Sequence, residues 1–106
     1  MKTEAQIKID FEQAIENAKR LQECGVVYQT IADKRLMDCM KKLSGQWDGY
    51  ASDAYQKKAE EIRADIVKTA RKLKTIGDTL EVEAKRLYEA EMKAITIAKT
   101  IISKKG

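Results

Sequence analysis

The hydrophobic residues in the second half of the chain recur with the spacing of an amphipathic α-helix. Counted from Ala59 in alternating steps of three and four residues, eleven of thirteen positions are apolar. This spacing keeps one face of a helix apolar along its length, and such a face requires a second helix to cover it. The pattern predicts one long helix over about residues 51–103. The large residues of its apolar stripe are Ile62, Ile66, Leu73, Ile76, Leu80 and Leu87.

The first half of the chain carries a similar but less regular stripe, which predicts a helix over about residues 4–44. Apolar residues alternate in steps of three and four from Ile7 as far as Tyr28. Beyond this point, successive apolar residues are closer to four positions apart. The change predicts a local rotation of the apolar face, or a bend, near Gly25. The sequence leaves two interpretations of Gly25 open. Either the missing side chain permits the close approach of a facing backbone, or the glycine is simply tolerated within the helix. The seam residues that we expect on this helix are Phe11, Leu21, Tyr28 and Leu36.

The break between the two helices lies near the middle of the chain, at about residues 45–50. Trp47, the single tryptophan, is followed there by Asp48 and Gly49. Glycine adopts the positive φ that reverses a chain, Asp48 is suited to bond nearby backbone amides, and Ser52 or Asp53 is placed to cap the second helix. We therefore expect one all-α domain over residues 1–106, folded as an antiparallel two-helix hairpin.

Apolar residues outside the two stripes indicate that the hairpin does not act alone. Each helix of a hairpin has one neighbour, so one hairpin cannot cover all of this apolar surface. The sequence therefore predicts that two hairpins pair into a four-helix bundle.

The composition limits the classes of partner. The chain has 21 basic and 17 acidic residues and a net charge of +4, which is typical of a mixed polar surface. Its one acid-free basic cluster is Lys68, Arg71, Lys72 and Lys74. This cluster is suited to an acidic partner or anionic lipid, although a solvated helix face is the more ordinary interpretation. We expect no nucleic-acid binding, because one cluster supplies few phosphate contacts. A membrane span is not expected, because no run of about 18 apolar residues occurs.

The residue types give little support for catalysis or for a cofactor. The chain has no histidine and two cysteines, Cys24 and Cys39. Fifteen residues of helix separate these cysteines by roughly 22 Å, far beyond the reach of a disulfide, and two isolated cysteines form no metal-ligand set. We expect no catalytic residues, no metal and no cofactor, and hence a protein that is not an enzyme.

Residues 43–55, LSGQWDGYASDAY, resemble the turn of the WXG100 (ESAT-6-like) family of small helical hairpins. The matching features are the Trp-x-Gly turn, the small residue Ala51 and the Ala54-Tyr55 pair, set between two long helices. The resemblance implies export by a type VII secretion system. It also implies that Trp47, Asp48 and Gly49 form part of a surface recognised by the secretion machinery, which includes an ATPase. The residues themselves leave a second interpretation open, in which Trp47 is only a packing latch of the hairpin against Tyr50 or Tyr55.

One departure from the family pattern concerns the end of the second helix. Many exported members, or their partners, carry Tyr-x-x-x-Asp/Glu there, whereas Tyr88 has Met92 four residues on and the nearest approach is Leu87 with Glu91. Leu87, Tyr88 and Glu91 are therefore a candidate degenerate signal.

The departure suggests that a partner supplies the missing half of the signal. That partner is another helical hairpin, in a homodimer or heterodimer, or the helical N-terminal domain of a secreted LXG-type toxin. The start of the chain lacks the apolar segment of a signal peptide, so we expect a cytoplasmic protein that is secreted by a signal-peptide-independent route. The alternative is a cytosolic coiled-coil structural or adaptor bundle with no role in secretion.

Overall fold

The protein folds as an extended hairpin of two helical arms, shown in a computed structural model that describes the backbone of residues 2–46 and 49–105. For residues 44–46, 50–52 and 105 only the backbone is described. The first arm consists of α1 (Glu4–Thr30), the π-helical segment η1 (Ile31–Leu36) and α2 (Met37–Gln46), and the second arm is the single helix α3 (Tyr50–Lys105). The described residues contain no strand, so the expected all-α hairpin is confirmed.

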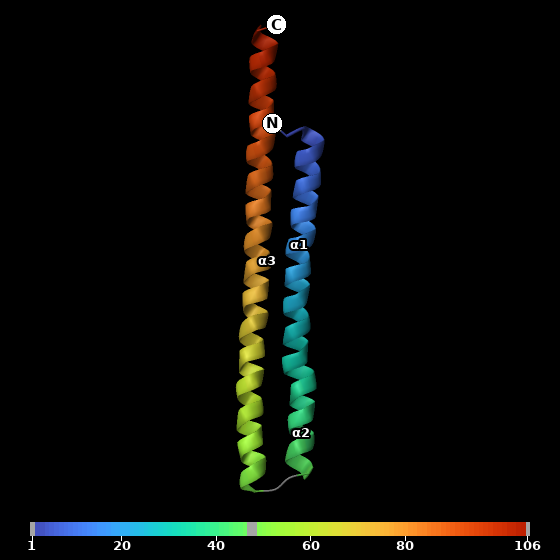
Figure 1. Cartoon of the computed structure of the whole chain (residues 1–106), viewed down its shortest axis with the longest axis vertical. Coiled ribbons are helices and arrows are strands. Elements are labelled where there is room, and N and C mark those ends of the chain that lie inside the picture. The colour runs from blue at the N-terminus through green and yellow to red at the C-terminus, as the bar shows by residue number, and fades with distance from the viewer. Residues whose placement is uncertain (1, 47–48, 106) are drawn as a thin grey trace.

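The two arms run antiparallel and side by side, with the turn at one end of the rod (Figure 1). The molecule measures 86 × 16 × 14 Å. Helix α3 sets this length, because its 56 residues span about 84 Å at the usual helical rise. The C-terminal end of α3 projects beyond the start of α1 (Figure 1).

Helix α1 begins with a capping box. The Thr3 hydroxyl oxygen accepts a hydrogen bond from the Gln6 backbone amide at 3.2 Å, and the Gln6 side-chain oxygen accepts one from the Thr3 amide at 3.0 Å. Two amides that have no partner within the helix are thereby satisfied. The acidic side chain of Glu4 lies in the first turn, where it interacts favourably with the helix dipole and forms an ion pair with Lys99 of α3.

The arms approach each other along a line of small residues. On the first arm these are Ala18, Gly25 and Ala32, each buried and seven residues from the next. On α3 the matching positions, also spaced by seven, are Ala70, Gly77 and Ala84, of which the first two are buried and the third is half-buried. A seven-residue repeat keeps these residues on the seam between two supercoiled helices.

The two glycines on this line lie directly against the facing backbone. A Cβ atom added to Gly25 would lie 2.9 Å from the Ala70 carbonyl oxygen, and one added to Gly77 would lie 2.8 Å from the Ala18 carbonyl oxygen. Of the two interpretations of Gly25, the structure therefore supports close backbone approach.

The predicted rotation of the apolar face takes place in η1, a few residues beyond Gly25. A π-helix contains more residues per turn than an α-helix, so η1 shifts the residues that follow it around the helix axis. Cys39, seven residues after Ala32, is accordingly exposed, whereas Met40 is half-buried.

Candidate recognition surface

Most of the apolar stripe predicted on α3 is left open by the hairpin. Ile62, Ile76, Leu80 and Leu87 are 46, 49, 42 and 58% exposed, and Ile66 and Leu73 are half-buried. The facing helix that the stripe requires is thus not supplied along its whole length by the first arm. Among the expected seam residues of the first arm, Phe11, Leu21 and Leu36 are half-buried and Tyr28 is 41% exposed.

The exposed stripe lies beside the line of small residues, on one broad side of the rod. An open hollow on this side is lined by Ala14 and Asn17 of α1 together with Leu80, Glu83, Ala84 and Leu87 of α3. Because side chains from both arms line the hollow, the stripe forms part of a face shared by the two arms.

At the turn, the structure describes Gly49 but not Trp47 or Asp48, which lie outside the described residues. Gly49 has φ +90°, the left-handed conformation predicted for it, and its carbonyl oxygen accepts a bond from the Asp53 amide at 3.2 Å. Helix α3 starts at Tyr50, before both residues that were expected to cap it. The prediction of a cap at Ser52 or Asp53 was therefore wrong, because Gly49 supplies the first accepting carbonyl of the helix.

The three residues of the candidate signal near the end of α3 have different surroundings. Leu87 is exposed. The Tyr88 ring packs against Phe11 of α1, with ring centroids 4.6 Å apart and planes tilted by 31°. The Glu91 carboxylate lies 3.5 Å from the Lys2 ammonium group, and its side chain is 22% exposed. Of the three, Leu87 is the one that the single hairpin presents most openly.

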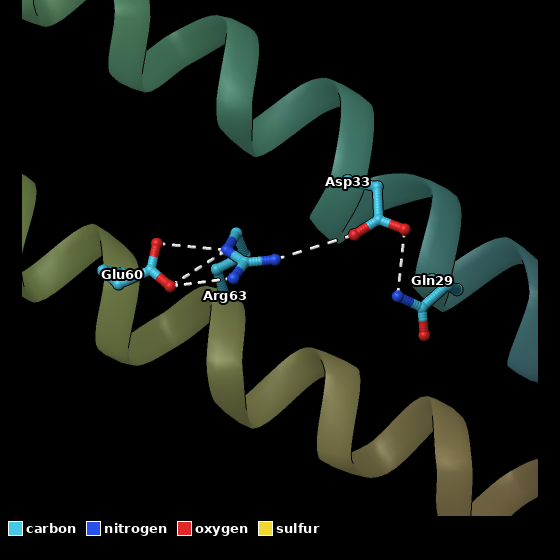
Figure 2. A network of polar contacts seen from close by, with 4 residues as sticks. All are labelled: Gln29, Asp33, Glu60 and Arg63. Carbon is cyan, nitrogen blue, oxygen red and sulfur yellow. Dashed lines mark hydrogen bonds and ion pairs between the residues drawn. The ribbon is translucent and has the colours of Figure 1, made fainter.

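A polar network links the two arms near η1 (Figure 2). The Arg63 guanidinium group donates three hydrogen bonds of 2.8 to 3.1 Å to the Glu60 carboxylate and lies 3.6 Å from the Asp33 carboxylate of η1. Gln29 donates a hydrogen bond of 3.0 Å to the same aspartate. These carboxylates raise the pKa of Arg63, chiefly through the bonds to Glu60. The network therefore connects η1 to α3 through charged and polar side chains.

A second polar contact lies beside Gly77. The Gln22 side-chain amide of α1 donates to Asp78 at 2.9 Å and to Glu81 at 3.1 Å, and both acceptors belong to α3. The bond from Gln22, followed by bonding and attraction to Lys85, lowers the pKa of the Glu81 carboxyl group. This side of the rod is therefore polar, in contrast to the side that carries the stripe.

The basic cluster divides between two surroundings. Lys74 is half-buried, and its aliphatic stem lies over Gly25. The other three basic residues are exposed and, with Thr75, surround the stripe residue Ile76. The cluster thus borders the apolar stripe with positive charge.

The described residues were compared with the requirements of a metal site and of a membrane-spanning helix. They hold no group of three or more His, Cys, Asp or Glu side chains placed to bind a metal ion. Cys24 and Cys39 are both exposed and free. None of the described helices combines the length and apolarity needed to cross a membrane.

These features define a class of protein: a slender helical hairpin that exposes an apolar stripe suited to another helix. Comparison with family models identifies the class more closely, since residues 6–92 match the WXG100 model, described as proteins of 100 residues with WXG. The chain belongs to the WXG100 family, whose members are small, non-enzymatic helical proteins secreted by type VII systems without a signal peptide. No curated protein and no solved structure matches the chain.

Proposed function

We propose that this protein works in type VII secretion by binding another helical protein, as a secreted bundle or as an export partner. The observation that carries the proposal is the exposed stripe of α3 in a chain that belongs to the WXG100 family. The partner is a second WXG100-like hairpin or the helical N-terminal domain of an LXG-type toxin. Apolar side chains that are half exposed over several turns stabilise a complex when a partner removes them from water.

The proposed address for the secretion ATPase has two parts, the turn at Trp47 and Gly49 and the end of α3. In a single hairpin, two of the three candidate residues near the end of α3 are engaged by the N-terminal part of the chain: Tyr88 packs on Phe11 of α1, and Glu91 pairs with Lys2, which precedes α1. This engagement, together with the missing Tyr-x-x-x-Asp/Glu pattern, favours a role in which the partner contributes part of the address.

The test is export of variants from cells of the source organism, measured as the ratio of secreted to cellular protein. We expect Trp47→Ala to lower that ratio while helicity and partner binding persist, because Trp47 falls between α2 and α3 in the sequence and is not one of the stripe residues. Leu87→Ala tests the other part of the address. Val82→Ala is its matched control, since Val82 is 55% exposed on the same helix.

The rival function is a cytosolic coiled-coil adaptor. It requires that the wild-type protein remain in the cell when the secretion system is active, and that Trp47→Ala change stability alone. Retention of the wild-type protein would overturn the secretion proposal, whereas a change in stability alone for Trp47→Ala would make the turn a structural latch and remove it from the proposed address.

A further inference from the structure

We propose that the last turns of α3 bind the surface of an anionic lipid membrane. The part concerned, the terminal segment of α3, comprises residues 92–105. The proposal goes beyond the function proposed above and does not depend on it, because binding to lipid vesicles is a property of the purified protein alone.

The net positive charge of the chain is concentrated in this segment. Residues 92–105 contain four lysines and no acidic residue, whereas residues 1–91 contain 17 basic and 17 acidic residues. The formal net charge of +4 therefore belongs entirely to the terminal segment. A charge of one sign over about four helical turns attracts a surface of the opposite sign. The four lysines are Lys93, Lys99, Lys104 and Lys105.

Large apolar side chains in the same segment are not covered by the first arm. Ile95 lies at the seam and is 8% exposed, whereas Ile102, seven residues later and at the same place in the repeat, is 70% exposed. The difference arises because α1 begins at Glu4, and Glu4 already pairs with Lys99. The part of α3 beyond Lys99 therefore projects past the first arm (Figure 1).

The isoleucines and lysines of the segment have the arrangement of a helix that lies in a membrane interface. At about 100° per residue, Ile97, Ile101 and Ile102 fall within an arc of about 140°. Lys104 falls just beyond the edge of the arc marked by Ile97, and Lys99 falls beyond the opposite edge. All five residues are exposed. In such a helix the apolar side chains enter the boundary between headgroups and acyl chains, and the lysine stems extend along it to the phosphates.

The side of the segment opposite the arc carries hydroxyl groups instead of charges. The Thr96 and Thr100 hydroxyl groups donate hydrogen bonds to backbone carbonyl oxygens of their own helix, at 3.1 and 2.9 Å, and Ser103 lies on the same side. A flat surface contacts only one side of a helix, and that side here holds the isoleucines with lysine at both edges. A membrane is favoured over an acidic protein because it needs no complementary groove and uses both the arc and its charged edges.

The first experiment is flotation of the purified full chain with vesicles of phosphatidylcholine that contain phosphatidylglycerol, compared with vesicles of phosphatidylcholine alone. We expect binding to the anionic vesicles that weakens as the salt concentration rises, and no binding to the neutral ones. Equal binding to both kinds of vesicle would overturn the proposal. Absence of binding to the anionic vesicles would also overturn it, and would leave an acidic protein as the partner of these lysines.

Paired charge variants test whether the terminal segment itself is the site. The double variant Lys93→Gln, Lys104→Gln should lower the partition coefficient by about 25-fold, because each lysine near an anionic surface contributes about fivefold. Its matched control is the double variant Lys41→Gln, Lys42→Gln, which removes the same charge from exposed positions of α2 near the turn. The control should bind almost as the wild type does. Equal losses in the two double variants would mean that only net charge matters, and would overturn the site.

An apolar variant tests the contribution of the isoleucines. Ile102→Gln should lower the partition coefficient by about tenfold, because the side chain no longer gains from leaving water. Val82→Gln is the control, since Val82 is 55% exposed on α3 outside the terminal segment and should leave binding unchanged. Circular dichroism checks that both variants remain helical. Equal binding by the two variants would overturn the role of the exposed isoleucines.

The last experiment tests which side of the helix meets the lipid. An environment-sensitive fluorophore is attached to Ile101→Cys or to Ser103→Cys, in the full chain with Cys24 and Cys39 replaced by serine. Positions 101 and 103 lie about 160° apart around the helix. Anionic vesicles should shift the emission to shorter wavelength at position 101 and not at position 103. Equal shifts at the two positions, or no shift at position 101, would overturn the proposed face.

Discussion

Replacing Gly25 by alanine tests whether close backbone contact sets the distance between the two arms. Gly25 lies in the interior of α1, on the line of small residues. The added Cβ atom would lie 2.7 Å from Lys74 Cγ, 2.9 Å from the Ala70 carbonyl oxygen and 3.3 Å from the Lys74 amide nitrogen. The lysine stem can rotate away, but the oxygen and the nitrogen belong to the backbone of α3, so the arms must move apart.

Two opposing effects decide the magnitude. Alanine is the better helix former by about 1 kcal/mol, and overpacking of a close contact costs about 1–3 kcal/mol. Separation of the arms also loosens the contacts of Ala18, Ala32 and Ala70, each of which is fully buried. We therefore expect the clash to exceed the gain in helix propensity, with a net loss of about 1–2 kcal/mol in the free energy of unfolding.

Urea unfolding followed by circular dichroism measures this loss, at one fixed protein concentration because association adds to stability. Ala64→Gly on the exposed side of α3 calibrates the propensity term in this protein and should cost about 1 kcal/mol. The Gly25→Ala, Gly77→Ala double variant should lose less than the two single variants together, since one substitution already separates the arms. If Gly25→Ala were instead more stable than the wild type by the propensity term, the close-contact argument would be refuted.

Two further predictions concern contacts between the arms. Tyr88→Leu removes the ring contact with Phe11 and should lower the free energy of unfolding by about 0.5–1.5 kcal/mol, and an unchanged urea midpoint would contradict the contact. Glu81→Gln tests a carboxyl group whose pKa is lowered in the folded state, so its stabilising effect is complete above the ordinary carboxyl pKa and is lost as the pH falls through the lowered one. The stability difference between wild type and variant should therefore shrink between about pH 5 and pH 3, and a difference independent of pH would contradict this.

The helical periodicity was sufficient to predict the two arms and their antiparallel arrangement. The same periodicity predicted the apolar stripe of α3, because a spacing of three and four residues places side chains on one face of a helix whichever partner covers that face. The same pattern did not reveal how the arms meet within one hairpin. Large side chains were expected along the whole contact, whereas alanine and glycine occupy its middle part and large buried residues, Ile7 and Ile95, lie toward the end away from the turn.

The missed signal was present in the sequence as a repeat of small residues. Ala18, Gly25 and Ala32 are spaced by seven, as are Ala70, Gly77 and Ala84. Hydrophobicity alone gives such residues little weight, although they permit the closest approach of two helices. The surroundings of the candidate signal were also beyond prediction, since the contacts of Tyr88 with Phe11 and of Glu91 with Lys2 depend on the register between the arms.

The π-helical segment has a consequence for how the length of this chain can vary. Without η1, the repeat that passes through Ala32 would continue to Cys39, and the thiol would lie against α3. With η1 in place, Met40 occupies that side and Cys39 is exposed. A deletion of one residue within 33–36 would place Met40 seven positions after Ala32, so the arm would continue as a regular α-helix with Met40 still against α3 and Cys39 still exposed. The same deletion between Ala18 and Gly25 would break the alignment of the small residues. Sequence variants that differ in length by a single residue are therefore expected to be tolerated at η1 and not within α1.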